Sequence, residues 1–401
     1  MKKWLAVFAL GLALFGLTGL GRCEEKGVTK DKIKIGVLTA MTGPYAEYDV
    51  MWSQGGKVVF DEINQKGGIY GRKIDYIVED DGCDSTKGSI AGKKLIYNEN
   101  VFALYSGVCT GVVNALVPDV EAEKIPLQPI GAAGTNYVRP WNKGPSGKYI
   151  FGGAMGLYYH GESMVDFALS RGWKKVAILY QTDQWGVEVY KGAKSQLEKS
   201  GLAFVAEESI VRDATDTSVQ VIKIREKNPD IVVLALYPRL GPIFLRQAYE
   251  LGLKTNFVAS AGMVSNLDTL RKTARDEALQ TFYYLWDRCD MPGGTGAPGC
   301  EISDWIKKIR KAYPDKANDP NFPNPYSIMG IGTATIFVEG LRRAGQDLTR
   351  EKFINALETM KDFDTKVLSS KISFSSNDHL TIRRGIIVKY TGDKQEIVYK
   401  P

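Results

Sequence analysis

Thr110 is the residue whose type and position in the sequence best suit ligand chemistry. It ends a turn of small residues, 106–110, that follows a short apolar run at 101–105 and precedes a helix-patterned segment at 111–123. A hydroxyl at a helix N-cap lies beside unpaired backbone N–H groups and the positive end of the helix dipole. This combination suits a carboxylate or another small anion.

A second turn of interest follows the next apolar run, 125–130. Gly131, Ala132 and Ala133 have almost no side-chain bulk, so backbone groups there can approach a ligand closely. Two adjacent turns of this kind would form a polar cleft at the carboxyl edge of a parallel sheet, where open α/β folds bind ligands. On these residues alone, ordinary βα turns are the simpler interpretation, because position in a fold does not establish function.

The elements that must position these turns alternate along the chain. Apolar runs of strand length have helix-patterned segments between them, and they lie at 32–38, 73–79, 101–105, 125–130, 174–180, 202–210, 230–236 and 255–260. Such alternation predicts an α/β protein with parallel sheets covered by helices on both faces. The 401-residue chain is too long for one sheet, so two lobes are expected, with breaks near 144–153 and 285–299.

Residues 1–23 are predicted to be a secretory signal peptide. Lys2 and Lys3 precede an apolar run that is too short for a stable membrane span. Cys23 would allow a lipid anchor, but Arg22 fits such a signal poorly, and cleavage after Cys23 is the simpler interpretation. The formal net charge is +6, three of the basic residues lie in this leader, and no basic block follows, which argues against a nucleic-acid partner.

Five short motifs occur in an order that is typical of one family. They are Met41–Tyr48 (MTGPYAEY), Asn64–Ile69 (NQKGGI), Asp80–Asp84 (DDGCD), Leu245–Ala248 (LRQA) and Gly252–Thr255 (GLKT). The chain after the leader resembles the periplasmic leucine/isoleucine/valine-binding proteins, the receptors of branched-chain and hydrophobic amino-acid ABC transporters. The resemblance implies the type I periplasmic binding fold, with two doubly wound parallel-sheet lobes, a three-crossing hinge and the ligand between the lobes. Residues 24–150 and 286–360 are assigned to the N-terminal lobe, and residues 151–285 and 361–401 to the C-terminal lobe.

Four cysteines remain after the leader, and an exported protein is expected to pair them. Of the three possible pairings, the local one joins Cys83 to Cys109 and Cys289 to Cys300. The resemblance supports the first pair, and the second would close a surface loop rich in Gly and Pro. The chain has only two histidines, His160 and His379, and no close Cys/His clustering, so neither a metal nor another cofactor is expected.

The resemblance also implies a set of ligand-binding positions. Thr110 stands where the family places a hydroxyl on the ligand carboxylate, and Ala132 and Ala133 match a turn whose backbone meets the ligand. The remaining positions are aromatic or lie in the same loops: Tyr48, Cys109, Gly131, Tyr158, Trp185, Tyr237 and Ala261. Tyr159, Trp286 and Tyr326 are ranked lower, as core residues.

Ala261 departs from the family pattern. Amino-acid-binding members carry an acidic residue there that pairs with the α-ammonium, and Ala133 stands where a threonine is usual. A buried ammonium without its counter-ion costs several kcal/mol. The sequence therefore favours an aromatic or aliphatic acid without an α-amine, unless Asp183, Asp213 or Asp216 restores the charge.

Three other functions are alternatives. An enzyme is not expected, because the chain has no complete P-loop and no Gly-x-Ser-x-Gly elbow. A true leucine/isoleucine/valine-binding protein remains open as an alternative. A ligand-sensing receptor partner also remains open, although a sensory ectodomain would need a transmembrane helix after it, and none is expected up to Pro401. The favoured hypothesis is a monomeric periplasmic protein that closes its hinge on a small carboxylate and delivers it to a membrane permease.

Overall fold

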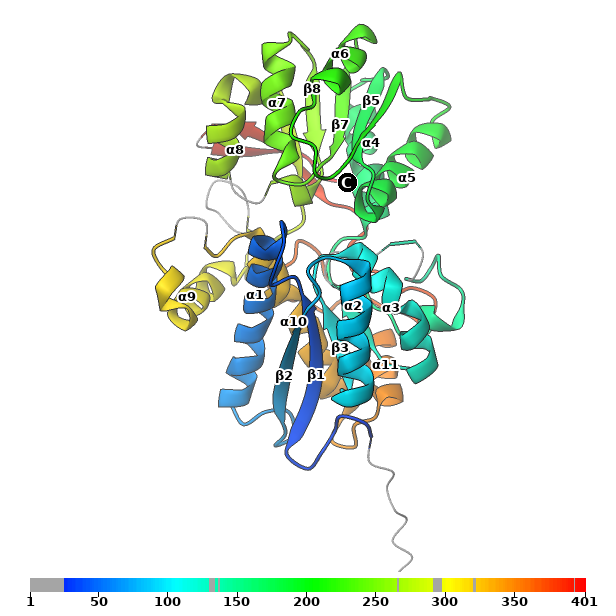
Figure 1. The fold of residues 1–401 in the computed structure, drawn as a ribbon, viewed down its shortest axis with the longest axis vertical. Helices are drawn as coiled ribbons and strands as arrows, with labels where there is room; N and C mark the ends of the chain where they lie inside the picture. The colour runs from blue at the N-terminus through cyan, green and yellow to red at the C-terminus, as the bar shows by residue number, and fades with distance from the viewer. Residues whose placement is uncertain are drawn as a thin grey trace, which may run out of the picture.

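The protein has two lobes, each built on its own sheet and placed one above the other along the long axis (Figure 1). The computed structural model describes residues 25–129, 134–135, 138–264, 267–290, 298–319, 322–392 and 394–401. The predicted signal peptide, with Cys23, therefore lies outside the described residues. So do Gly131, Ala132 and Ala133.

The first lobe is a four-stranded parallel sheet of order β2-β1-β3-β4. Its strands are β1 (Lys32–Thr39), β2 (Lys73–Asp80), β3 (Ala103–Ser106) and β4 (Leu127–Pro129). The helices around it are α1 (Ala46–Gln65), α2 (Ser85–Lys93), α3 (Thr110–Glu123), α9 (Ile302–Ala312), α10 (Pro325–Ala344) and α11 (Arg350–Glu358). α1 packs on α10, and α2 packs on α3. A Cβ at Gly55 would lie 2.0 Å from the Ser327 carbonyl oxygen, so this glycine sets the closeness of α1 and α10.

The second lobe is a seven-stranded sheet of order β11-β10-β9-β8-β7-β5-β6. Five parallel strands form its body, namely β5 (Val176–Gln181), β6 (Ala206–Ile210), β7 (Ile231–Ala235), β8 (Asn256–Ala259) and β9 (Phe282–Trp286). The antiparallel hairpin β10 (Ile386–Thr391) and β11 (Lys394–Tyr399) extends one edge. The helices are α4 (Leu157–Ser170), α5 (Gln184–Lys199), α6 (Ser218–Glu226), α7 (Leu240–Glu250) and α8 (Leu267–Ala274). The predicted α/β architecture of two doubly wound, largely parallel lobes is confirmed.

The chain moves between the sheets three times: after β4, after β9 and before β10. Before the last passage, Phe374 donates its N–H to the carbonyl of Met360, two residues beyond the end of α11, and its ring packs edge-on against Phe151. The exact lobe limits at 150, 285 and 360 stay a prediction.

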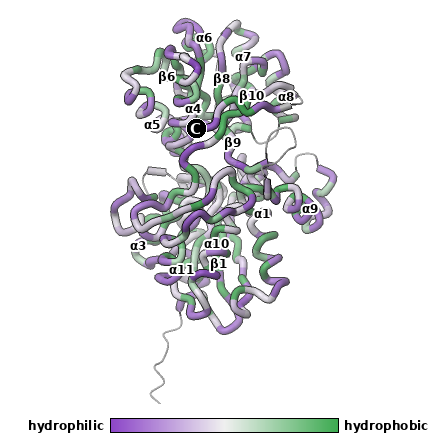
Figure 2. The backbone as a smooth tube through the Cα atoms, turned by 180° about the vertical axis from the view of Figure 1, so that it is seen from behind, coloured by the Kyte–Doolittle hydropathy of each residue, from purple (hydrophilic) through white to green (hydrophobic). Residues whose placement is uncertain are grey.

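The central strands are buried on both faces, as parallel strands under helices must be. Every residue of β3 and of β7 is buried. Figure 2 shows hydrophobic segments running through the interior of each lobe and hydrophilic ones gathered at the outer helices and turns. This pattern explains why the strands read as continuous apolar runs instead of alternating ones.

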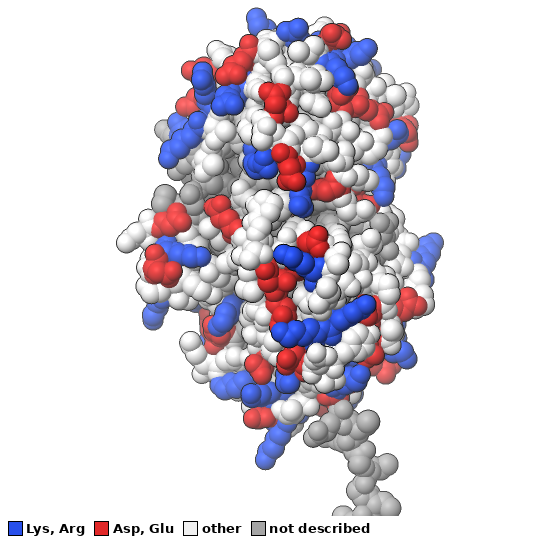
Figure 3. Space-filling view, in the orientation of Figure 1, with Lys and Arg blue, Asp and Glu red and all other residues white. Residues whose placement is uncertain are grey.

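Both predicted disulfides are confirmed. Cys83 is bonded to Cys109 and Cys289 to Cys300, with Cα–Cα distances of 5.4 and 5.7 Å. On the face shown in Figure 3, basic and acidic side chains are interspersed over both lobes. Among the described residues, no helix combines the length and the apolar character needed to cross a membrane.

Candidate functional site

The candidate site lies between the lobes, where loops that follow strand ends of the two sheets meet. Thr110 is the first residue of α3, so the N-cap is Cys109 and not Thr110 as predicted. Trp185 lies in the first turn of α5 after β5, and Tyr237 follows β7. Ala261 begins a short 3₁₀-helix, Ala261–Met263, after β8. The sequence placed all four at the carboxyl ends of strands, and the fold puts them on facing sides of one cleft.

A hollow of about 310 Å³, which we name the Thr110 hollow, opens between the lobes. The first lobe contributes Cys83, Ser85, Cys109, Thr110, Gly111 and Asn114, and the second contributes Asp183, Gln184, Trp185, Arg212 and Tyr237. Thr110 is 3% exposed, and its Oγ1 atom has no hydrogen-bond partner among the described residues. A buried hydroxyl at a helix N-terminus thus has no hydrogen-bond partner in the part of the chain that the structure describes.

A second, smaller space lies toward the segments that cross between the lobes, and we name it the hinge cavity. Its volume is about 40 Å³, and its walls are mostly apolar or aromatic: Val108, Ala154, Met155, Leu157, His160, Trp185, Tyr237, Ala261, Gly262, Asp287, Arg288, Pro325, Tyr326 and Met329. Trp185 and Tyr237 line both spaces, and their rings stack with centroids 4.4 Å apart. This stacked pair therefore separates the Thr110 hollow from the hinge cavity.

Several contacts join the lobes across the cleft. The Tyr326 hydroxyl donates to the Gly262 carbonyl at 2.9 Å. Thr135 donates both its N–H and its Oγ1–H to Glu188 Oε2, at 3.0 and 2.7 Å, and Glu188 is fully buried. Because these hydrogen bonds span the cleft, the two lobes are closed on each other in this structure.

The charges in the Thr110 hollow come from Arg212 and Asp183. The Arg212 guanidinium lies 4.6 Å from the centre of the Tyr45 ring, and it makes no ion pair with any described residue. Burial raises the pKa of Asp183, and the Gly186 N–H, which donates to Asp183 Oδ1 at 2.9 Å, opposes that rise together with Arg212. The second lobe thus contributes to the hollow a cation that makes no ion pair with any described residue, and a carboxyl that already caps α5.

The structure brings together most of the predicted site residues that it describes. Cys109, Thr110, Trp185 and Tyr237 line the Thr110 hollow, and Ala261 lines the hinge cavity.

The two other predicted tyrosines lie differently. Tyr48, on α1, packs its ring 5.4 Å from that of Tyr326, a hinge-cavity residue. Tyr158, on α4, packs 5.2 Å from Trp141. Neither lines the Thr110 hollow or the hinge cavity, as far as the described residues define those spaces. Their roles in binding stay predictions.

Other residues of the cleft were missed or ranked low at the sequence level. Arg212, His160, Asp287 and Arg288 were not predicted to line it, and Tyr326 was ranked as a core residue. Asp287 and Arg288 directly follow β9, so the rule that ligands lie beyond strand ends could have found them. The sequence carries no comparable signal for Arg212 or His160.

Two buried carboxyls lie behind Thr110. Asp49 and Asp81 each place an oxygen within 4.8 Å of the other and of the Cys109 sulfur. That sulfur is bonded to Cys83, so it is no thiolate ligand, and the two acids are better explained as a coupled pair. Burial and mutual repulsion raise the pKa of Asp49 to about 8, and burial raises the pKa of Asp81 to about 6. Asp49 accepts the N–H groups of Ala40 and Val108, so it positions the loop that leads to Thr110.

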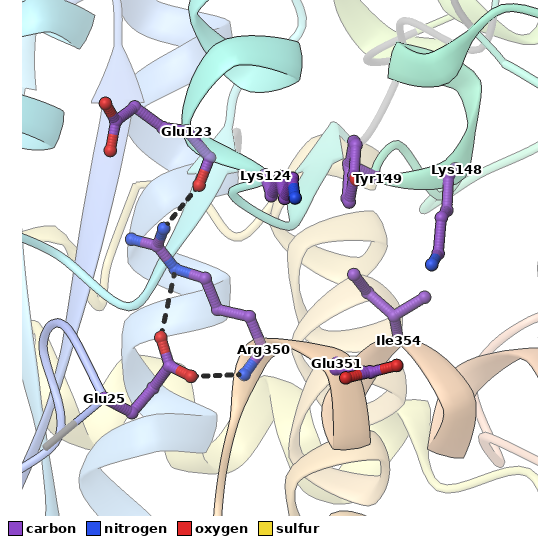
Figure 4. Close-up of a pocket in the computed structure, with 8 residues that line it drawn as sticks. All are labelled: Glu25, Glu123, Lys124, Lys148, Tyr149, Arg350, Glu351 and Ile354. Atoms are coloured by element: carbon purple, nitrogen blue, oxygen red, sulfur yellow. Dashed lines mark hydrogen bonds and ion pairs between the residues drawn. The ribbon is translucent and has the colours of Figure 1, made fainter. Parts of the chain in front are cut away.

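A larger hollow of about 360 Å³ at the start of α11 is a weaker candidate (Figure 4). Arg350 is 8% exposed there and donates to the carbonyls of Phe102, Glu123 and Val101 at 2.7–2.9 Å. Glu25 accepts the backbone N–H of Arg350 at 3.1 Å. Because the arginine is already satisfied by protein groups, its function here is to fasten α11 to β3 and α3.

The comparisons with known proteins agree with this geometry. A family model described as periplasmic binding protein matches residues 32–395. The chain belongs to this family. Leu/Ile/Val-binding protein homolog 7 of Brucella abortus (strain 2308) is 24% identical over 316 residues, which cover 78% of this chain and 77% of that protein. An amino acid binding protein of Pseudomonas aeruginosa is 28% identical over 278 residues, or 68% and 70% of the two chains.

Solved structures show the same fold. A fatty acid ABC transporter substrate-binding protein from Thermomonospora curvata matches with a TM-score of 0.77 and 25% identity, over 93% of each chain. A solute-binding protein of an ABC transporter from R. palustris, in complex with benzoate, matches with a TM-score of 0.75 over 92% of this chain and 95% of that one. At 17% identity, that likeness concerns the fold alone. The predicted leucine/isoleucine/valine-type periplasmic binding family is confirmed. The prediction that the chain is a solute-binding protein, and not an enzyme, is confirmed by the same relatives.

Proposed function

We propose that this protein is the receptor of an ABC transporter for a small aromatic or aliphatic acid that lacks an α-amine. The ligand carboxylate binds in the Thr110 hollow, and the apolar body lies against Trp185 and Tyr237. The closed lobes then present the loaded receptor to the membrane permease.

The observation that carries the proposal is the unpartnered Thr110 hydroxyl. Its oxygen is buried at the N-terminus of α3, where the positive end of the helix dipole favours an anion. Arg212 faces the same hollow without an ion pair to any described residue. A carboxylate between the hydroxyl and the guanidinium would satisfy both groups with charge-assisted hydrogen bonds.

The walls favour an acid over an amino acid. Ala261 occupies the place of the family's acidic residue, and it lines the hinge cavity beside apolar and aromatic side chains. Two structural neighbours are described, by their own names, as a fatty acid receptor and as a benzoate complex. These neighbours support the idea that this fold accommodates acids without an α-amine.

An amino-acid receptor is the second candidate, and Asp183 is the observation in its favour. Of the three acids considered in the sequence, Asp183 lines the Thr110 hollow. Asp213 lies 3.8 Å from Arg239, and Asp216 bonds Ser218 and Gln247 outside the hollow. Asp183 would have to serve an ammonium while it still caps α5.

A thermal-shift screen of the mature protein against amino acids and against aromatic and aliphatic acids tests the proposal. A ligand at 100 times its Kd stabilises the folded state by about 2.7 kcal/mol, which is an easily measured shift. We expect a shift with at least one simple acid and none with leucine, isoleucine or valine. A shift with those amino acids alone would establish the second candidate in place of the first.

A further inference from the structure

The hinge cavity contains a polar corner that the proposed function does not use. His160, on the first turn of α4, and Asp287 and Arg288, just after β9, line it opposite the apolar residues. Their side chains are only 4%, 2% and 7% exposed. Three ionisable groups are thus buried at the point where the chain crosses between the lobes.

Two side-chain atoms of this corner have no hydrogen-bond partner among the described residues. His160 Nδ1 and Asp287 Oδ2 are both buried, and neither makes a hydrogen bond within the described part of the chain. Buried polar atoms in folded proteins are nearly always paired, with protein, water or ligand. The cavity, at about 40 Å³, exceeds the roughly 10–15 Å³ that one water requires. The corner is therefore built to receive a small hydrogen-bonding group.

The surrounding charges narrow the chemistry of that group. Burial lowers the pKa of His160 to about 4, so its imidazole is neutral near pH 7 and offers one donor and one acceptor. Burial raises the pKa of Asp287, and the neighbouring Arg288 opposes the rise. Arg288 itself is engaged, because its Nε donates to Asp290 Oδ1 at 3.1 Å and its guanidinium stacks 3.8 Å over Trp286. A cationic group would be repelled by Arg288, and an anionic group would be repelled by Asp287. An uncharged ligand group therefore fits best.

We propose that the hinge cavity is a subsite for a hydroxyl group at the end of the ligand remote from its carboxylate. This inference rests on the proposed function. The Trp185–Tyr237 pair borders both spaces, so a ligand body along that pair places one end toward Thr110 and the other toward His160 and Asp287. The ligand hydroxyl donates a hydrogen bond to Asp287 Oδ2. It makes its second hydrogen bond with His160 Nδ1.

Paired ligands test the subsite without any change to the protein. Calorimetry compares benzoate with 4-hydroxybenzoate and with 4-methoxybenzoate, and hexanoate with 6-hydroxyhexanoate. We expect at least one hydroxy acid to bind about 10-fold more tightly than its parent, and a methyl ether to lose that gain, because one well-made buried hydrogen bond is worth about this factor. Equal affinities within every pair would overturn the subsite and leave the proposed function standing. If no acid of any pair binds, the proposed function fails, and the subsite fails with it.

Variants then assign the preference to named residues. Asp287→Leu and His160→Leu each remove an unpartnered polar atom, so both should reduce the preference for the hydroxy acid to near unity and leave the parent acid's affinity within about 3-fold. His379→Leu is the matched control, because that buried histidine is fully engaged: Nδ1 with the Ile150 carbonyl and Nε2 with Glu358. It should lower stability and keep the preference. A preference that survives in both Asp287→Leu and His160→Leu would also overturn the assignment.

Discussion

Replacing Thr110 by valine separates a ligand-binding hydroxyl from a structural one. The two side chains have nearly the same shape, and Thr110 Oγ1 is buried without a partner in the described structure. Removing an unpaired buried hydroxyl should leave the ligand-free protein equally stable, or stabilise it by up to about 1 kcal/mol. Removing a charge-assisted hydrogen bond to a carboxylate should cost about 1.5–3 kcal/mol of binding free energy, a factor of roughly 10 to 150 in Kd.

Thr217→Val is the matched control for this experiment. Thr217 is also fully buried, but its hydroxyl donates to Gln247 Oε1 at 2.5 Å in the second lobe. This variant should lose about 0.5–1.5 kcal/mol of unfolding free energy and keep its affinity for the acid, because one buried hydrogen bond away from the cleft is lost while Gln247 Oε1 still accepts the backbone N–H of residue 217.

Urea denaturation of the ligand-free proteins and calorimetry with the best acid from the screen give both quantities. The expected result is a crossed pattern, with Thr110→Val weak in binding and Thr217→Val weak in stability. The reasoning is refuted if Thr110→Val unfolds more easily by 2 kcal/mol or so and binds the acid as the unmodified protein does. That outcome would make the hydroxyl a structural group.

Three further predictions concern neighbouring features. Ala261→Glu should introduce measurable amino-acid binding, because it would supply the acidic partner for an ammonium that the resemblance to the family implies at this position; calorimetry with leucine, on this variant beside the unmodified protein, checks it. Burial, together with repulsion from Asp81, raises the pKa of Asp49, so the folded chain holds more protons than the unfolded chain above about pH 4, and the unfolding free energy should fall as pH rises toward about 8. Asp81→Asn should make that fall shallower in urea midpoints measured from pH 5 to 8, and an unchanged slope would contradict the pairing. Arg350→Met should lose about 3–5 kcal/mol of unfolding free energy by leaving the buried carbonyls of Val101 and Phe102 and the half-buried carbonyl of Glu123 unpaired, with acid affinity unchanged in calorimetry.

The fold was largely predictable because it depends on periodicity and length. Parallel strands under two helical layers appear as short apolar runs, and these runs located every strand up to β8. The run at 202–210 was too long, because only Ala206–Ile210 pairs with β5. Residues 202–205 continue the loop after α5. An apolar stretch does not by itself show at which residue the hydrogen-bonded pairing of two strands begins.

The site was predictable only where it follows one strand end at a time. Thr110, Trp185 and Tyr237 each sit directly beyond a strand, so local sequence was sufficient. The polar corner of the hinge cavity unites α4 with the segment after β9, which are more than a hundred residues apart, and no local pattern records that meeting. Tyr48 illustrates the same limit, since its partner Tyr326 belongs to α10.

Because the hinge cavity is small, we expect the Trp185–Tyr237 pair to be the wall that moves when the ligand binds. Pockets for small ligands usually measure about 300–1,000 Å³. The Thr110 hollow, at about 310 Å³, reaches that range, whereas the hinge cavity holds only about 40 Å³. A ligand anchored at Thr110 can reach the hinge only if the stacked rings that separate the two spaces shift or the lobes part. Parting the lobes would break the Tyr326–Gly262 and Thr135–Glu188 hydrogen bonds. Rotation of the aromatic pair would break neither of them, so we expect the rings to shift on binding and to join both spaces into one chamber, with the proposed carboxylate site at one end and the proposed hydroxyl site at the other.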